Sequence, residues 1–249
     1  MGIQKTSAVI LSVLPYLESS TIVSLYTDDH GRVNGIAKGV RKNSKNSLPL
    51  ERGILIDLIL YAKHGRELHT LTDIHILEYY PCIRVDLYKT AIRDAAFELL
   101  LKPVMLSEPH PELFSLLQQF LNLLQSADTM ESCFVLLWRF YFKIAELLGF
   151  AIHFESCRSC GQDRLFSEGG FLAVESGGLY CNKCAQKRSL PDTFIQGTVL
   201  QKLAGTSLPL KCSFRELVRL SRLAASYCRF HLEIKPEFKS LEFIEQMSW

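Results

Sequence analysis

Two pairs of cysteines, each in the pattern C-x2-C, constrain this chain more than any other feature of its sequence. The pairs are "CRSCG" at 157–161 and "CNKC" at 181–184, with twenty residues between Cys160 and Cys181. A C-x2-C pair places two thiolates on one tight turn, and two such turns complete a tetrahedral four-thiolate site. The spacing therefore predicts one structural zinc ion, closed to water, on Cys157, Cys160, Cys181 and Cys184.

Other interpretations of the cysteines stay open beside zinc. A redox C-x2-C usually occurs once, near the start of a helix in a strand–helix–strand context, and that context is absent here. A secreted disulfide scaffold would be shorter and denser in cysteine. The other four cysteines are scattered through apolar or helical stretches, as is typical of free buried thiols: Cys82, Cys133, Cys212 and Cys228. Zinc is the favoured interpretation, with a redox pair, a disulfide and chance pairing as the alternatives.

Residues 1–80 have the pattern of short strands. Apolar and β-branched runs are separated by turn formers such as "DDHG" at 28–31, and they lie at 7–16, 20–27, 32–40, 53–62 and 67–77. Five short strands without an intervening helical pattern predict a small barrel or sandwich. The polar, basic segment "RKNSKNSLP" at 41–49 is predicted to be a loop.

Helical periodicity replaces this pattern after Pro81. Runs with helical spacing occupy 85–102, 111–126, 130–150, 193–204 and 213–232, and a last turn is expected at 239–247. The insert "LFSEGGFLAVESGGLY" before the second cysteine pair is expected to form a short hairpin. The predicted fold class is α+β, with a strand domain at 1–80 and a helical domain at 81–152 and 188–249. A four-cysteine module at 153–187 interrupts the helical domain.

Positive charge is concentrated between residues 31 and 66. Eight Lys and Arg residues stand against Glu51 and Asp57, a local charge of +6 (8 − 2) in a chain whose total is +2. Such a field suits a phosphate backbone, whereas a solvated barrel surface is the alternative. The eight are Arg52 and the seven predicted to contact DNA: Arg32, Lys38, Arg41, Lys42, Lys45, Lys63 and Arg66.

A second basic surface is predicted on the helix at 213–232. At 100° per residue, the cations from Lys211 to Arg229 fall within an arc of about 80°, opposite an apolar side centred on Leu217 and Ala224. A solvated face would normally mix both signs of charge. Nucleic acid or an acidic partner segment is therefore expected on this stripe, with Arg215, Arg219 and Arg222 as the contacts.

Arg139 and Lys143 lie one turn apart in the apolar helix "FVLLWRFYFKIAELLGF". Two cations beside an apolar groove would suit an acidic peptide with a hydrophobic end. Ion pairs with Glu131 or Glu146 are the alternative, which the sequence favours.

No motif of an enzyme is apparent. The chain lacks GxxxxGK[ST], GxGxxG and GxSxG motifs, "DDH" at 28–30 is better explained as a hairpin turn, and His153 is surplus to a site with four thiolates. No apolar run approaches the roughly 18 residues of a membrane span. Because Pro15 and Glu18 follow the apolar N-terminal stretch and no cleavage site is visible, we expect a mature N-terminal strand in a cytoplasmic protein.

Taken in order, these segments resemble the bacterial recombination mediator family RecO. The resemblance rests on "VLPYLESSTIVSLYTDDHGRVNGIAKGVRK", on "AELLGF" followed by "CRSCG" and "CNKC", and on "YCRFHLEIKPEFKSLEFIEQM", and it spans essentially the whole chain. It implies an N-terminal OB-fold, a helical domain and an inserted four-cysteine zinc element. Some members of the family lack the cysteines, so their presence here indicates a metal-holding version.

The resemblance also implies a function without catalysis. The family binds single- and double-stranded DNA, anneals complementary strands, and acts with RecR and with single-stranded DNA-binding protein. It thereby helps to load RecA onto coated strands. The acidic, Phe-ending tail of the coating protein would suit the groove at Arg139 and Lys143. Two other classes stay open: a zinc-containing interaction scaffold that does not anneal DNA, and a zinc hydrolase, against which the four-thiolate count argues.

Overall fold

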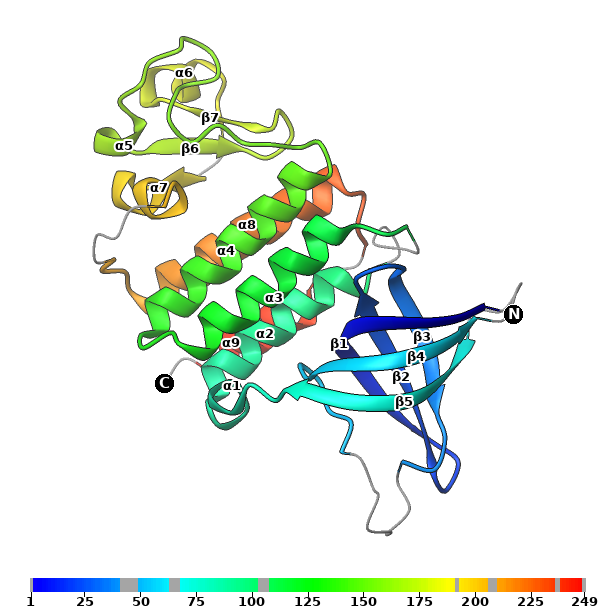
Figure 1. Cartoon of the computed structure of the whole chain (residues 1–249). Coiled ribbons are helices and arrows are strands. Elements are labelled where there is room, and N and C mark those ends of the chain that lie inside the picture. The colour runs from blue at the N-terminus through cyan, green and yellow to red at the C-terminus, as the bar shows by residue number, and fades with distance from the viewer. Residues whose placement is uncertain are drawn as a thin grey trace. The chain divides into compact units, whose positions relative to one another are not determined.

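The computed structural model describes residues 2–40, 49–62, 68–102, 108–190, 193–205, 210–235 and 238–247 (Figure 1). The chain divides into two compact units, each described here by itself. The first contains residues 1–93 and 97–126, and the second contains residues 94–96 and 127–249. The division at residues 80, 152 and 187, expected from the sequence, stays a prediction.

A closed five-stranded barrel forms the N-terminal part of the first unit. Its strands are β1 (Gly2–Tyr16), β2 (Ser20–Thr27), β3 (Gly31–Ala37), β4 (Leu55–Ala62) and β5 (Leu68–Glu78), in the order β1-β2-β3-β5-β4. Strands β3 and β5 are parallel, and the other neighbours are antiparallel. The closed barrel confirms the predicted OB-type fold and excludes the sandwich.

Inward-facing side chains of all the strands fill the barrel. Alternate residues of neighbouring strands are buried in one cluster that includes Ala8, Ile10, Val23, Leu25, Ile56, Leu58 and Leu71. Gly35 belongs to the same interior face, where a Cβ atom would lie 2.5 Å from the side chain of Leu71. Glycine at position 35 therefore leaves the space that Leu71 occupies.

Side-chain hydrogen bonds close the turn between β2 and β3. The hydroxyl of Thr27 donates to the backbone oxygen of Gly31 at 2.9 Å and accepts from the amide of His30 at 3.0 Å. This geometry confirms the hairpin turn predicted from "DDHG". It also accounts for the Asp-Asp-His sequence without a metal nuclease site.

Three helices follow the barrel: α1 (Pro81–Val85), α2 (Leu87–Leu100), of which residues 94–96 belong to the second unit, and α3 (Pro111–Gln125). The carboxylate of Asp86 caps α2 by accepting from the amide of Lys89 at 2.9 Å. The side-chain oxygen of Gln125 accepts from the amides of Cys82 and Ile83 at the start of α1. The short helix α1 was not predicted, because a single turn carries no periodic signal.

The second unit is built on two long helices that pack side by side, α4 (Met130–Leu147) and α8 (Phe214–His231) (Figure 1). The indole N–H of buried Trp138 donates to the hydroxyl of Ser221 at 2.7 Å. The thiol of Cys228 donates to the backbone oxygen of Tyr141 at 3.3 Å. The last helix of the unit is α9 (Lys239–Gln246).

Short elements carry the cysteine module: α5 (Leu165–Glu168), β6 (Gly170–Ala173), β7 (Gly178–Tyr180), α6 (Asn182–Lys187), β8 (Phe194–Ile195) and α7 (Gly197–Leu203). The predicted hairpin is confirmed by the pairing of β6 with β7. The single helix expected at 193–204 is wrong at its start, because Phe194 and Ile195 pair with β6 as strand β8. Among the described helices, none combines the length and apolarity needed to cross a bilayer.

Candidate metal centre and basic surfaces

The four predicted metal ligands lie together in the second unit. The Sγ atoms of Cys157, Cys160, Cys181 and Cys184 are all within 4.8 Å of one another, and those of Cys160 and Cys181 are 3.8 Å apart. A tetrahedral ion bound about 2.3 Å from each sulfur would separate the sulfurs by about 3.8 Å, so the cluster fits a metal ion. A disulfide requires a separation of about 2.05 Å, and all four cysteines are free thiols.

The first cysteine pair lies on a tight turn held by backbone hydrogen bonds. The amide of Gly161 donates to the oxygen of Cys157, and the amide of Cys157 donates to the oxygen of Gln162, both at 2.8 Å. Gly161 has a φ of +71°, which glycine adopts without steric strain. The amide of Arg158 donates to the oxygen of Leu179 at 2.8 Å and so joins this turn to β7.

The second pair lies where β7 passes into α6. Cys181 directly follows β7, and Cys184 lies in the first turn of α6. The amide of Cys181 donates to the Sγ atom of Cys157 at 3.3 Å, which links the two pairs. Strands β6 and β7 therefore set the distance between two turns that are far apart in the sequence.

The thiols of the cluster differ in acidity. Burial opposes ionisation of Cys157, but hydrogen bonds from the backbone amides of Cys181, Cys160 and Ser159 outweigh it and lower its pKa to about 6. Desolvation, with the neighbouring Cys181 and Cys160 groups, raises the pKa of Cys184 to about 12. The amides therefore favour the thiolate form of Cys157, which binds a cation, whereas the surroundings of Cys184 oppose its ionisation.

The cluster has the form of a structural site. Cys157 and Cys181 are buried, Cys184 is partly buried and Cys160 is exposed. Within the described part of the chain, these cysteines form the one group of Cys, His, Asp and Glu side chains able to hold a metal ion. His153 is exposed and lies outside this group. Four thiolates fill a tetrahedral coordination sphere and leave no position for a reacting water.

Two of the seven predicted DNA contacts on the barrel are described by the structure. Lys38 follows β3, and its side chain is exposed. Arg32 is half-buried, donates a hydrogen bond to the backbone oxygen of Leu101, and has its pKa lowered by burial. Lys38 thus faces solvent, whereas Arg32 joins the barrel to the end of α2. The other five lie outside the described residues: Arg41, Lys42, Lys45, Lys63 and Arg66.

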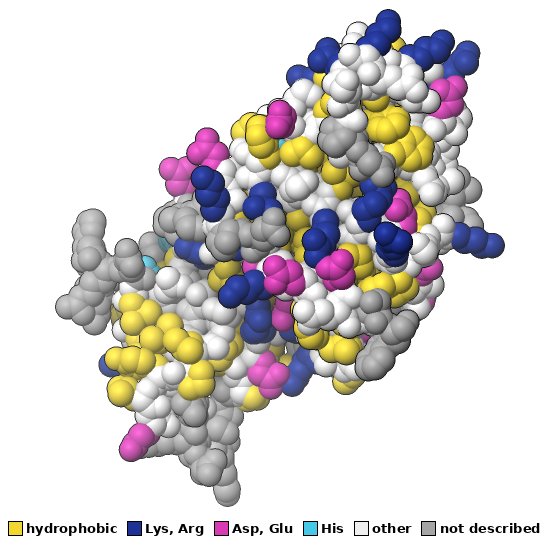
Figure 2. All heavy atoms as spheres, turned by 180° about the vertical axis from the view of Figure 1, so that it is seen from behind, with side chains coloured by type: hydrophobic (Ala, Val, Ile, Leu, Met, Phe, Trp, Pro, Cys, Tyr) yellow, Lys and Arg dark blue, Asp and Glu magenta, His cyan; other side chains and the backbone are white. Residues whose placement is uncertain are grey.

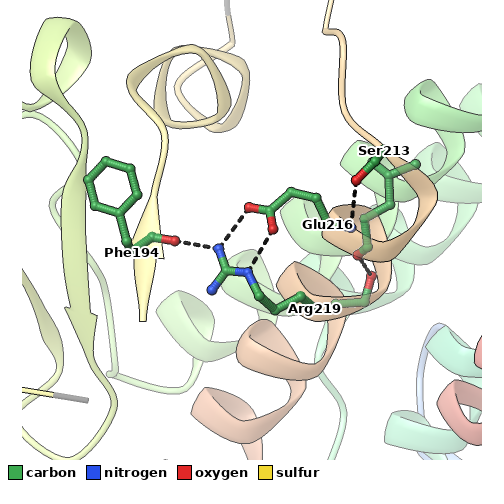
Figure 3. A network of polar contacts seen from close by, with 6 residues as sticks. Phe194, Ser213, Glu216 and Arg219 are labelled. Carbon is green, nitrogen blue, oxygen red and sulfur yellow. Dashed lines mark hydrogen bonds and ion pairs between the residues drawn. The ribbon is translucent and has the colours of Figure 1, made fainter. Parts of the chain in front are cut away.

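Arg219 of the predicted stripe on α8 is held by two partners. Its guanidinium makes two bonds of 2.7 Å with the carboxylate of Glu216, and it also donates to the backbone oxygen of Phe194 (Figure 3). A bidentate pair of this kind fixes the guanidinium in one orientation. Arg219 therefore fastens α8 to β8.

The two neighbouring arginines of the stripe differ from each other. Arg222 forms an ion pair with Glu245 of α9. Arg215 is exposed near the start of α8. Arg215 is thus the member of this predicted set that the structure leaves most open to a ligand.

The cations of the predicted peptide groove on α4 also have partners. The Nε atom of Arg139 donates to the backbone oxygen of Lys202 at 3.0 Å, and burial lowers the pKa of this guanidinium. Lys143 pairs with Glu146 at 2.6 Å, as the alternative interpretation expected. Arg139 therefore satisfies a carbonyl at the end of α7, and binding of a partner by either residue stays a prediction.

Two family models match most of the chain. The model of the N-terminal part of recombination protein O matches residues 1–80, and the model of its C-terminal part matches residues 84–242. The chain belongs to the RecO family. The three residues between the two matches, 81–83, are the first three of α1.

Relatives in the RecO family are similar to the chain over most of its length. The DNA repair protein RecO of Syntrophus aciditrophicus is 27% identical over 251 residues, which cover 98% of this chain and 95% of that protein. RecO of Desulfitobacterium hafniense is 29% identical over 227 residues, covering 90% and 78%. RecO of Geobacter metallireducens is 31% identical over 185 residues, covering 73% and 72%. The family predicted from the motifs is thereby confirmed.

One basic group of this RecO-family chain was missed by the sequence analysis. Lys183 and Lys187 lie on α6, are both exposed, and carry a positive charge directly beside the metal cluster. The signal was present in the sequence, because residues 176–190 contain three cations and no Asp or Glu. The spacing of the cysteines does not by itself indicate the lysines that lie between and after them.

Proposed function

We propose that this protein is a DNA-binding mediator of recombinational DNA repair, without catalytic activity. It would bind and anneal single strands and help to load RecA onto strands coated with single-stranded DNA-binding protein. The observation that carries the proposal is the match of both RecO family models, at 1–80 and 84–242, to a chain whose N-terminal part is a closed five-stranded barrel. Such barrels commonly bind single-stranded nucleic acid.

The proposed mechanism is electrostatic. The sequence from residue 31 to 66 has a local charge of +6. Among the residues of this segment that the structure describes, Lys38 is exposed. Cations that neutralise phosphates release counterions and bring two strands together without chemistry on either strand. Positioning of this kind needs no general acid, base or nucleophile, which is consistent with the lack of a catalytic motif in the sequence.

The proposed metal is one structural zinc ion on the four cysteines. A zinc ion bound by four thiolates supplies stability to the surrounding fold and holds no reactive water. The residues of the chain then have the task of presenting a fixed surface. Support comes from the sulfur separations, which fit tetrahedral coordination, and from the hydrogen bond of Cys181 to Cys157.

The proposed partners are single- and double-stranded DNA, RecR and single-stranded DNA-binding protein, with RecA acting indirectly. The protein would work in the bacterial cytoplasm, on the nucleoid when bound to DNA. We retain the groove at Arg139 and Lys143 as the proposed site for the acidic tail of the coating protein. The tail would have to replace Glu146 at Lys143, because that glutamate now pairs with the lysine.

Annealing of coated strands tests the proposal. Complementary oligonucleotides, each coated with the cognate single-stranded DNA-binding protein and labelled with a fluorescence pair, are mixed with and without the metal-loaded protein. We expect faster annealing that declines as salt is added. No acceleration by folded, metal-loaded protein would refute the mediator function and favour an interaction scaffold.

The basic loop gives a second, more local prediction. Replacing Arg41, Lys42 and Lys45 with Gln removes three positive charges from the sequence between β3 and β4. If each neutralises one phosphate of a single strand, the slope of log affinity against log salt becomes shallower by about 2. Fluorescence anisotropy of a labelled oligonucleotide at several salt concentrations measures this slope. An unchanged slope excludes these three residues from the interface.

A further inference from the structure

The exposed cations of α6 carry an inference that rests on the proposed function. Lys183 and Lys187 are four residues apart and Arg188 follows at the end of the helix, and all three side chains are exposed. In Figure 2, Lys and Arg side chains gather over the four-cysteine module, at the top of the view. Residues 176–190 contain no Asp or Glu, and the nearest acidic residues in the sequence are Glu175 and Asp192.

These lysines differ from other exposed cations of the second unit. Lys143, Arg164 and Arg222 each pair with a glutamate, Glu146, Glu168 and Glu245 respectively. In the part of the chain that the structure describes, neither Lys183 nor Lys187 has an ion pair. Their charge is therefore available to a ligand at no cost in broken ion pairs.

The metal cluster fixes the direction in which the lysines point. Cys184 must face the other three sulfurs and Ala185 is buried, so one side of α6 is turned toward the module. At 100° per residue, Lys183 and Lys187 lie within about 40° of each other and about 60–100° away from Cys184. They share one face, and four residues of helix separate them by about 6 Å along the axis.

Arg188 is held on the same short segment by an aromatic ring. Its guanidinium lies 5.0 Å from the centroid of Tyr180, the last residue of β7. A cation over a ring face is held in place while its outer N–H groups remain free to donate. The module thus presents three cations on a surface anchored at Cys181 and Cys184 on one side and at Tyr180 on the other.

We infer that α6 is a second contact for the phosphate backbone of nucleic acid, separate from the barrel, and that the four-cysteine cluster serves to present it. Two lysines on one helical face, with a third cation beside them and no acid, suit successive phosphates rather than a base edge. The contact would add affinity without sequence preference. An acidic peptide would be a different partner, and the test below separates the two.

The rival explanation is that the lysines offset the charge of the cluster itself. Four thiolates around a divalent ion carry a net charge of −2, and Lys183 lies between two of the ligands in the sequence. This explanation requires the metal affinity to fall when the lysines are replaced. The phosphate contact requires the metal affinity to stay the same.

The test compares three metal-loaded proteins: wild type, K183Q/K187Q, and the control K235Q/K239Q. The control removes the same charge at two exposed lysines of the second unit, one after α8 and one at the start of α9. Binding of a labelled single-stranded oligonucleotide is measured over a range of salt concentrations, and binding of a labelled acidic peptide is measured beside it. Metal affinity is measured by competition with a chromophoric chelator. We expect the slope of log affinity against log salt to be about 1.4 shallower in K183Q/K187Q. The control should have the wild-type slope, and both variants should have the wild-type metal affinity.

Each other outcome overturns the inference in a recognisable way. A wild-type slope in K183Q/K187Q excludes α6 from the interface while the proposed function stands. An equal change of the slope in the control would show that net charge alone causes the effect. Weaker metal binding in K183Q/K187Q would favour the rival explanation. If only an acidic peptide, and not the oligonucleotide, distinguishes the variant from wild type, the partner is a protein. No binding of DNA by wild type would instead refute the proposed function, and this inference with it.

Discussion

Removal of the metal from the four-cysteine cluster is expected to unfold the module around it and to leave the long helices intact. The module has little other structure to support it. Its strands β6 and β7 contain four and three residues, and β8, which pairs with β6 from outside the module, contains two. Sheets this small are marginal in water. A metal ion bound by the four cysteines would therefore supply most of the stability of this region.

The size of the effect follows from the ligand set. Binding of structural zinc in small modules contributes on the order of 10 kcal/mol, which is as large as the stability of a whole domain. A loss of about 10 kcal/mol corresponds to about seven powers of ten in the local opening equilibrium. The amides of the module should then exchange close to the rate of an unfolded chain.

Hydrogen exchange with mass spectrometry measures this directly. The amides of Arg158, Gly161, Cys181 and Ala185 donate hydrogen bonds within the module. After a strong chelator has removed the metal, peptides covering these residues are expected to lose protection. Peptides from α4 and α8 should keep it, because a buried bond of 2.7 Å between Trp138 and Ser221 and a shared apolar face join those helices without the metal.

Two variants make the interpretation sharp. Cys181→Ser should reproduce the effect of the chelator, since it removes one ligand. Cys82→Ser is the matched control, because Cys82 is exposed and lies outside the cluster. Full protection of the module after measured loss of the metal would refute the reasoning. Loss of protection throughout α4 and α8 would also refute it, since the metal would then support more than its own module.

Two further substitutions test the packing that positions these surfaces. Ser221→Ala leaves the buried indole N–H of Trp138 without its acceptor, so we expect a loss of about 1–3 kcal/mol in the free energy of unfolding. Ser226→Ala on the same helix, whose hydroxyl only donates to a carbonyl three residues back, should change it by less than about 0.5 kcal/mol in denaturant titrations. Gly35→Ala places a Cβ atom 2.5 Å from the side chain of Leu71 and should destabilise the barrel by about 1–3 kcal/mol. Equal denaturant midpoints of wild type and Gly35→Ala would show that the barrel interior can accommodate the added Cβ atom.

Much of the fold could be read from the sequence because its signals are local. Alternation of apolar residues predicted all five strands, and helical spacing predicted α2, α3, α4 and α8 to within a few residues at each end. The prediction at 193–204 was wrong at its start. Phe194 lies in a strand because it pairs with Phe171, and no local sequence pattern indicates that partner.

The candidate site divides in the same way. Both cysteine pairs were found because each C-x2-C is a local turn, and the sulfurs of the four residues do lie within 4.8 Å of one another. The partner of each cation could not be predicted in this way. Helical spacing put Arg219 on an outward stripe, but it cannot reveal that a distant carbonyl, that of Phe194, lies within reach of the guanidinium.

The sequence by itself determined the order of barrel and helices, the family and the four cysteines that cluster, since each depends on residues close together along the chain or on motifs in a fixed order. Only the tertiary structure decided which cations bind the protein's own carbonyls and carboxylates and which remain exposed. Arg139 and Arg219 satisfy backbone oxygens that are 63 and 25 residues away, whereas Lys183 and Lys187 face solvent. The physical reason is that periodicity fixes the direction of a side chain on its own helix, while the group that meets it there comes from another segment.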